Sequence, residues 1–260
     1  VPDTYDEVIE ACNTIGLDNP DYDVPFTITL SAGWAWEIEF FQMLRAYGGQ
    51  YLNDDSTAAF NSEAGVNAVN KITEVADACM GEAGYALGND AIEVGIQMGT
   101  QVFTNLWASR AANMLDPERT DLVGVIKFAP APRATADGPR AGSAWNDYYM
   151  IPATTTNDAD LIFRIIMEAA DERSQRDAAE LGMASRLAVA DYGGVYLPAA
   201  GQTIAEGIGI YTTNPANGIV RAKLGEFLPL VGTGEMTAQE ALDAAAEAYT
   251  TEATAQGYID

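Results

Sequence analysis

Histidine is absent from this chain of 260 residues. Its absence excludes a serine–histidine–aspartate triad, a cysteine–histidine pair and every metal site built on imidazole. Lysine and arginine number only 13 against 38 acidic residues, which gives a formal net charge of -25. A nucleic-acid partner would meet repulsion over most of such a surface. Most familiar hydrolase chemistries and nucleic-acid binding are therefore excluded.

Other signals are missing as well. No run of 18 or more apolar residues suits a membrane-spanning helix. The phosphate-binding loop GxxxxGK[ST] and a GxGxxG turn after a strand are absent, so no nucleotide cofactor is expected, and no metal site is expected either. Only two cysteines occur, Cys12 and Cys79, too few and too far apart for a zinc knuckle or a redox CxxC. The two cysteines are therefore expected either to form a disulfide or to be buried as free thiols.

What the sequence contains is the composition of a packed globule, with 48% hydrophobic and 20% charged residues. Helical and strand patterns alternate along it. We predict helices at 3–16, 34–49, 63–74, 90–99, 158–182, 218–230 and 237–257, strands at 24–31, 100–109, 122–132 and 143–153, and an irregular stretch at 185–217. This alternation predicts an α/β fold with helices on both faces of a sheet.

The four tryptophans lie at predicted junctions between strands and loops. They are Trp34, Trp36, Trp107 and Trp145. Ligands bind beyond the carboxyl ends of strands in open α/β sheets, and an indole offers a flat apolar face to a sugar ring. A single tryptophan is more often a core residue. Four at such junctions indicate that at least two line a cleft.

Three charged residues are further candidates. Glu37 and Glu39 lie beside two of the tryptophans, which raises a histidine-free glycoside hydrolase with a carboxylate pair as an alternative function. Residues two apart on a helix point in different directions, which speaks against it. Arg186 follows a predicted helix and could bind a polar ligand through two hydrogen bonds or form a surface ion pair.

Six blocks of sequence occur in an order found in one known family. They are VPDTYDE, FFQMLRAYGGQYLNDDSTAAFNSEAGVNAV, IEVGIQMGTQVFTNLW, GSAWNDYYMIPATTTNDADLIFRII, ELGMASRLAVAD and GEMTAQEAL. Together they resemble the family 1 extracellular solute-binding proteins of ABC importers, the maltose-binding-protein-like group that captures sugars and polyols. Tyr5 stands where that family has tryptophan, and Ala184 where it has proline.

The resemblance implies a two-lobed, hinged binder with a periplasmic-binding-protein type II fold and a mixed sheet. Residues 1–142 and 197–260 would form the C-terminal lobe, and residues 143–196 would cross the hinge and belong to the N-terminal lobe. Because the family's first matching block lies well past its chain start, the resemblance also implies that this chain lacks most of the N-terminal lobe.

The resemblance also assigns roles to residues. Trp34 or Trp36, together with Trp107, fall where relatives stack aromatic rings on the ligand, and Trp145 and Arg186 fall where relatives touch it. The implied function is a monomeric, non-catalytic receptor without a cofactor, whose partners are a sugar or polyol and the membrane subunits of an ABC permease. A periplasmic or extracellular setting would favour a disulfide between the two cysteines. A non-transport interaction module remains a third alternative.

Overall fold

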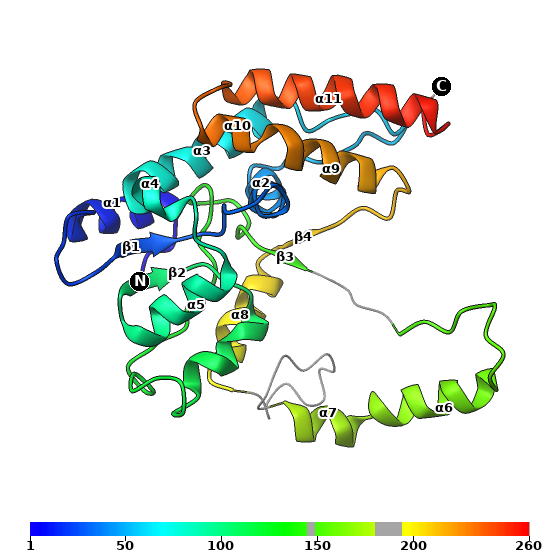
Figure 1. The fold of residues 1–260 in the computed structure, drawn as a ribbon, viewed down its shortest axis with the longest axis horizontal. Coiled ribbons are helices and arrows are strands. Elements are labelled where there is room, and N and C mark those ends of the chain that lie inside the picture. Colours follow the sequence, from blue (N-terminus) through cyan, green and yellow to red (C-terminus); the bar gives the residue numbers. More distant parts are fainter. Residues whose placement is uncertain (145–148, 180–193, 260) are drawn as a thin grey trace.

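A computed structural model describes residues 1–144, 149–179 and 194–259. These residues form a helical body, from which residues 149–179, called the arm below, project to one side (Figure 1). The body contains two pairs of short strands. The α/β class predicted from the sequence is therefore confirmed, although within the described residues the sheet consists of two parallel pairs and not of one mixed sheet.

The first pair joins β1 (Val24–Thr27) to β2 (Gln101–Thr104), with Phe26 opposite Phe103. The two strands are parallel, so the chain must cross over between them. The crossover holds α2 (Gly33–Ala46), α3 (Glu63–Cys79), α4 (Gly81–Gly84) and α5 (Asn89–Met98). Since both strands run the same way, the loops that follow them leave from the same edge.

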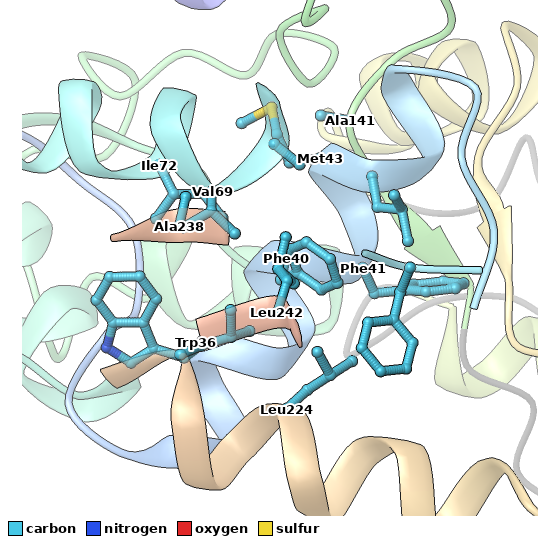
Figure 2. Close-up of a cluster of buried hydrophobic side chains, with 14 of the residues drawn as sticks. Trp36, Phe40, Phe41, Met43, Val69, Ile72, Ala141, Leu224, Ala238 and Leu242 are labelled. Atoms are coloured by element: carbon cyan, nitrogen blue, oxygen red, sulfur yellow. The ribbon is translucent and has the colours of Figure 1, made fainter. Parts of the chain in front are cut away.

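Helix α2 lies at the centre of the body. Eleven of its 14 residues are buried, so it must present apolar side chains on nearly every side. It packs against α3 and against α9 (Asn217–Phe227). Figure 2 shows Phe40 and Phe41 of α2 gathered with apolar residues of these neighbouring helices. This cluster fixes the direction in which α2 presents its first turn.

The helix starts follow the capping signals of the sequence. Helix α1 (Tyr5–Ile15) begins after Thr4, whose hydroxyl accepts a hydrogen bond from the backbone N–H of Glu7. Helix α11 (Ala238–Ala255) begins with a reciprocal capping box between Thr237 and Glu240. The short α10 (Pro229–Gly232) links α9 to this last helix. No helix in the described part of the chain is both long enough and apolar enough to cross a membrane.

The second strand pair lies where the chain leaves the body and returns to it. Strands β3 (Ser143–Ala144) and β4 (Gly209–Ile210) are parallel, and α8 (Leu197–Ala205) precedes β4 (Figure 1). Helix α8 and strand β4 fall inside the stretch 185–217, which was predicted to be irregular.

A cluster of four charged side chains holds the starts of β3 and β4 together. Arg140 donates hydrogen bonds from Nε to Glu206 at 2.7 Å and from Nη2 to Asp3 at 2.9 Å. Arg133 pairs with the same two carboxylates. Arg140 itself is only 4% exposed. We call Asp3, Arg133, Arg140 and Glu206 the ionic clamp.

The arm consists of α6 (Ala159–Ala169) and α7 (Glu172–Ala178), and neither helix has a buried residue. Leu161, Phe163 and Ile165 of α6 are each more than half exposed. A single exposed apolar side chain is ordinary, but a whole helix of this composition with no covered face is not.

Three further predicted elements differ from the structure. Residues 122–132 form no strand: 122–125 lie in a turn, where Gly124 adopts a positive φ of 84°, and 126–132 have no regular secondary structure. The predicted strand 143–153 is a strand only at its first two residues within the part described. The single helix predicted at 158–182 is two helices, since Asp171 accepts a hydrogen bond from the backbone N–H of Ser174 and starts α7.

The two cysteines are both buried and bridged. Cys12 on α1 and Cys79 at the end of α3 form a disulfide, with their Cα atoms 5.1 Å apart. Of the two states left open by the sequence, the structure has the bridge. It closes a loop with a sequence separation of 67 residues and ties α1 to α3.

We expect removal of this bridge to destabilise the chain. A closed loop of this length restricts the unfolded state by an amount worth about 4 kcal/mol in the chain-entropy treatment. The double variant Cys12→Ala, Cys79→Ala should lose close to that free energy of unfolding in urea denaturation. Wild type under reducing conditions should match the variant, and equal stability of the oxidised and reduced wild type would contradict the expectation.

Glu39 places an ionisable group inside the core. Its side chain is 7% exposed, and the backbone N–H of Thr29 donates a hydrogen bond to its carboxyl group. Burial raises the pKa of Glu39 from 4.5 to about 8, and the bond from Thr29 offsets only part of that rise. The carboxyl group also lies near the buried phenol of Tyr5, whose pKa is raised by burial and by Glu39.

This shift predicts a pH dependence of stability. Between pH 4.5 and about 8 the folded state holds a proton on Glu39 that the unfolded state has lost, so stability falls as the pH rises through this window. Glu39→Gln removes the ionisation and should flatten the curve measured by urea denaturation. Glu10→Gln, on the exposed side of α1, is the control, and a Glu39→Gln variant with the slope of wild type would show that the assignment is wrong.

Helices α2 and α9 touch through their backbones at two glycines. A Cβ atom added to Gly33 would lie 2.1 Å from the carbonyl oxygen of Gly225, closer than any real contact. Because Gly33 begins α2 and Trp34 follows it, this contact sets where the indole of Trp34 stands.

Gly33→Ala should therefore push the two helices apart. Overpacking of this kind costs about 1 to 3 kcal/mol, and the fluorescence of the adjacent tryptophan should change as well. Gly218→Ala on α9 is the matched control, since nothing lies within 4 Å of an added Cβ there. Urea denaturation with a tryptophan readout compares the two, and equal effects would refute the role of the glycine contact.

Candidate functional site

Two of the predicted tryptophans meet at the edge where β1 and β2 end. Trp34 is the second residue of α2, and Trp107 precedes the 3-10 helix η1 (Ala108–Leu115) that follows β2. Their ring centroids are 6.3 Å apart and the planes are tilted by 38°. Trp34 is 48% exposed and Trp107 38% exposed. Parallel pairing thus joins residues that are far apart in the sequence into one exposed aromatic surface, called the tryptophan pair below.

Trp36 is corrected from a candidate site residue to a core residue. Its side chain is 2% exposed and stacks against Tyr85, with the ring centroids 6.2 Å apart. Gly232 has no room for a side chain because the indole of Trp36 fills the space. Because Trp36 lies two residues after Trp34 on the same helix, its ring points in a different direction. It lies in the cluster of Figure 2 and cannot reach the exposed edge.

A groove of about 450 Å³ lies beside Trp34, between α2 and α9. It is lined by Trp34, Glu37, Arg221, Ala222, Gly225 and Glu226. An apolar ring next to carboxylates and a guanidinium is the combination that binds a molecule with one apolar face and several hydroxyl groups.

A buried network stands behind the groove. Glu37 is 1% exposed and accepts hydrogen bonds from Tyr51 Oη at 2.6 Å and from Arg221 Nε at 3.0 Å. The guanidinium of Arg221 lies over the ring of Tyr211 at 4.9 Å. Burial raises the pKa of Glu37, against the opposing effect of Tyr51 and Arg221. Arg221 was not predicted as a site residue. The only signal in the sequence is that it is one of just 13 basic residues.

Glu37 and Glu39 do not form a carboxylate pair. The Glu37 carboxylate faces Arg221 and Tyr51, whereas the Glu39 carboxyl group faces the backbone of Thr29 in the core. A glycosidase needs both groups on one substrate bond. The two glutamates therefore share no reacting centre, and the hydrolase alternative has no support.

A second charged cluster holds the other ring. The guanidinium of Arg110 lies 5.9 Å from the centroid of Trp107. Its Nη1 pairs with Asp90 at 2.7 Å and with Glu93 at 2.9 Å, both on α5. These ion pairs orient Arg110 against the indole, so one side of Trp107 is occupied by a cation from the chain itself.

The remaining predicted site residues, Trp145 and Arg186, lie outside the described residues, so their roles stay predictions. In the part of the chain that the structure describes, no cluster of three or more cysteine, aspartate or glutamate side chains is arranged to hold a metal ion.

Comparisons with known proteins agree on the fold. The sequence matches no protein-family model and no curated protein. An ABC-transporter solute-binding protein from Agrobacterium radiobacter, in complex with ribitol, has 18% identity and a TM-score of 0.74, and the match covers 96% of this chain and 65% of that chain. One from Agrobacterium vitis, with bound D-mannitol, has 16% identity and a TM-score of 0.76, covering 98% and 67%.

A third neighbour is the maltose/maltodextrin-binding domain from Bdellovibrio bacteriovorus bound to maltotriose, with 13% identity and a TM-score of 0.74, covering 98% of this chain and 67% of that chain. Identities this low show the fold alone. The chain spans 65% of the length of the ribitol-bound neighbour. The resemblance found in the six sequence blocks is thereby confirmed in fold: this chain folds as a large part of an ABC-transporter solute-binding protein does.

Proposed function

We propose that the chain is the substrate-binding receptor of an ABC importer, or the greater part of one, and that it captures a sugar or polyol. The observation that carries the proposal is the tryptophan pair, exposed beside a polar groove on this fold. The neighbours described above are binding proteins with ribitol, D-mannitol or maltotriose bound.

The proposed mechanism is capture without chemistry. The indoles stack on the C–H face of the ligand, and Arg221 and Glu226 at the groove bond its hydroxyl groups. Closure around the ligand then stabilises a second conformation, which a membrane permease recognises. Occupancy is signalled only if the ligand binds the closed state more tightly than the open one.

We also propose the division into lobes. Residues 1–142 and 197–260 form one lobe, and residues 143–196 cross a hinge and pack against a second lobe. Two observations support this assignment: β3 and β4 carry the chain out of the body and back, and α6 exposes its apolar side chains. A second lobe would occupy the part of the neighbours' length that this chain does not span.

A periplasmic or extracellular setting and a monomeric state complete the proposal. The Cys12–Cys79 bridge supports the setting, because disulfides persist in oxidising compartments and are rare in the cytosol. The negative surface charge is compatible with a periplasmic and with an extracellular location, and it does not distinguish between the two.

A thermal-shift screen against polyols and malto-oligosaccharides tests the proposal. A ligand that binds only the folded chain raises the Tm. Trp34→Ala and Trp107→Ala should each lose most of that shift, since one aromatic contact is worth about 0.5 to 1.5 kcal/mol. Trp36→Phe is the matched control: it lowers the Tm of the free chain but keeps the shift. Undiminished shifts in both alanine variants would reject the stacking site.

A further inference from the structure

We infer that the tryptophan site selects its ligand by charge: it accepts neutral and amine-bearing sugars or polyols and rejects those that carry a carboxylate or phosphate. This inference rests on the proposed function and narrows its substrate class. It is carried by the distribution of charged side chains around the two rings and the groove.

Carboxylates outnumber cations on both sides of the tryptophan pair. At Trp107, Arg110 and Arg119 pair with three carboxylates, those of Asp90, Glu93 and Asp116. The side chain of Asp90 is 92% exposed, so its carboxylate lies at the surface, where it pairs with the Arg110 that lies against Trp107.

The groove beside Trp34 has the same balance. Its lining holds one cation, Arg221, and two carboxylates, Glu37 and Glu226. Arg221 pairs with Glu37, and Glu226 pairs with Lys223, which lies outside the lining. Glu226 lines the groove with its side chain 60% exposed. The cations that an anionic ligand would need are thus already engaged by carboxylates of the chain.

The two indole rings also favour a positively charged ligand over a negatively charged one. An indole face carries partial negative charge, and Arg110 already exploits this at Trp107. An ammonium group placed over Trp34 would gain a similar attraction and would also approach Glu226. A carboxylate or phosphate at that place would meet a ring face and the exposed carboxylate of Glu226, and it would have to compete with Glu37 for the guanidinium of Arg221.

The experiment uses the 260-residue chain and sets of three ligands that share a carbon skeleton and differ in charge. Suitable sets are glucose, glucosamine and glucuronate, and sorbitol, glucamine and gluconate. Binding is measured by calorimetry and tryptophan fluorescence up to high millimolar ligand, at low and at high salt. In any set whose neutral member binds, we expect the amine to bind at least as tightly and the acid about tenfold more weakly or worse, with the difference shrinking at high salt.

Three variants test which carboxylates cause the difference in affinity between the amine and the acid. Glu226→Gln and Asp90→Asn should each narrow the difference between amine and acid, whereas Glu10→Gln on α1 removes the same charge elsewhere and should leave it unchanged. An acid that binds as tightly as its neutral counterpart overturns the inference while the proposed function stands. If no sugar or polyol of these sets or of the thermal-shift screen binds, the proposed function fails, and the inference fails with it.

Discussion

The parallel pairing of β1 with β2 is the constraint on which the rest of the structure depends. It joins residues separated by more than seventy positions and sends both following loops out from one edge. This pairing brings Trp34 and Trp107 to the same end of the two strands, where they become neighbours. A slip of one residue between the strands would turn Phe26 or Phe103 to the opposite face of the pair and would displace the following loop, with its tryptophan, along the strand direction.

Burial of α2 on nearly all sides explains the unusual chemistry near the site. A central helix with 11 buried residues in 14 has no outer face for polar groups, so Glu37 and Glu39 are carried into the interior. Glu37 accepts hydrogen bonds from the guanidinium of Arg221 and the phenol of Tyr51, whereas Glu39 accepts one from the backbone N–H of Thr29. What looks in the sequence like a catalytic pair is therefore a consequence of packing, and the raised pKa of each glutamate reports burial.

Local signals predicted much of this molecule, and long-range contacts explain what they could not predict. Capping residues such as Thr4 and Thr237 mark helix starts within a few positions, and the helix pattern of α2 needs no partner to be recognised. In contrast, the Glu37–Arg221 ion pair joins residues 184 positions apart, and no local pattern predicts it. Trp34 and Trp36 have equal claims in the sequence, and only the packing of α2 decides which is exposed.

The ionic clamp has a mechanical consequence for the arm. Arg140 and Glu206 hold the chain at the two points just before β3 and β4, and each of these strands is two residues long. Bending upstream of either strand would break the pairs that the buried Arg140 makes with Asp3 and Glu206, so the clamp opposes such bending. The two strands that flank the arm in the sequence therefore cannot move independently of each other, because one cluster ties the starts of both to Asp3 near the chain's first residue.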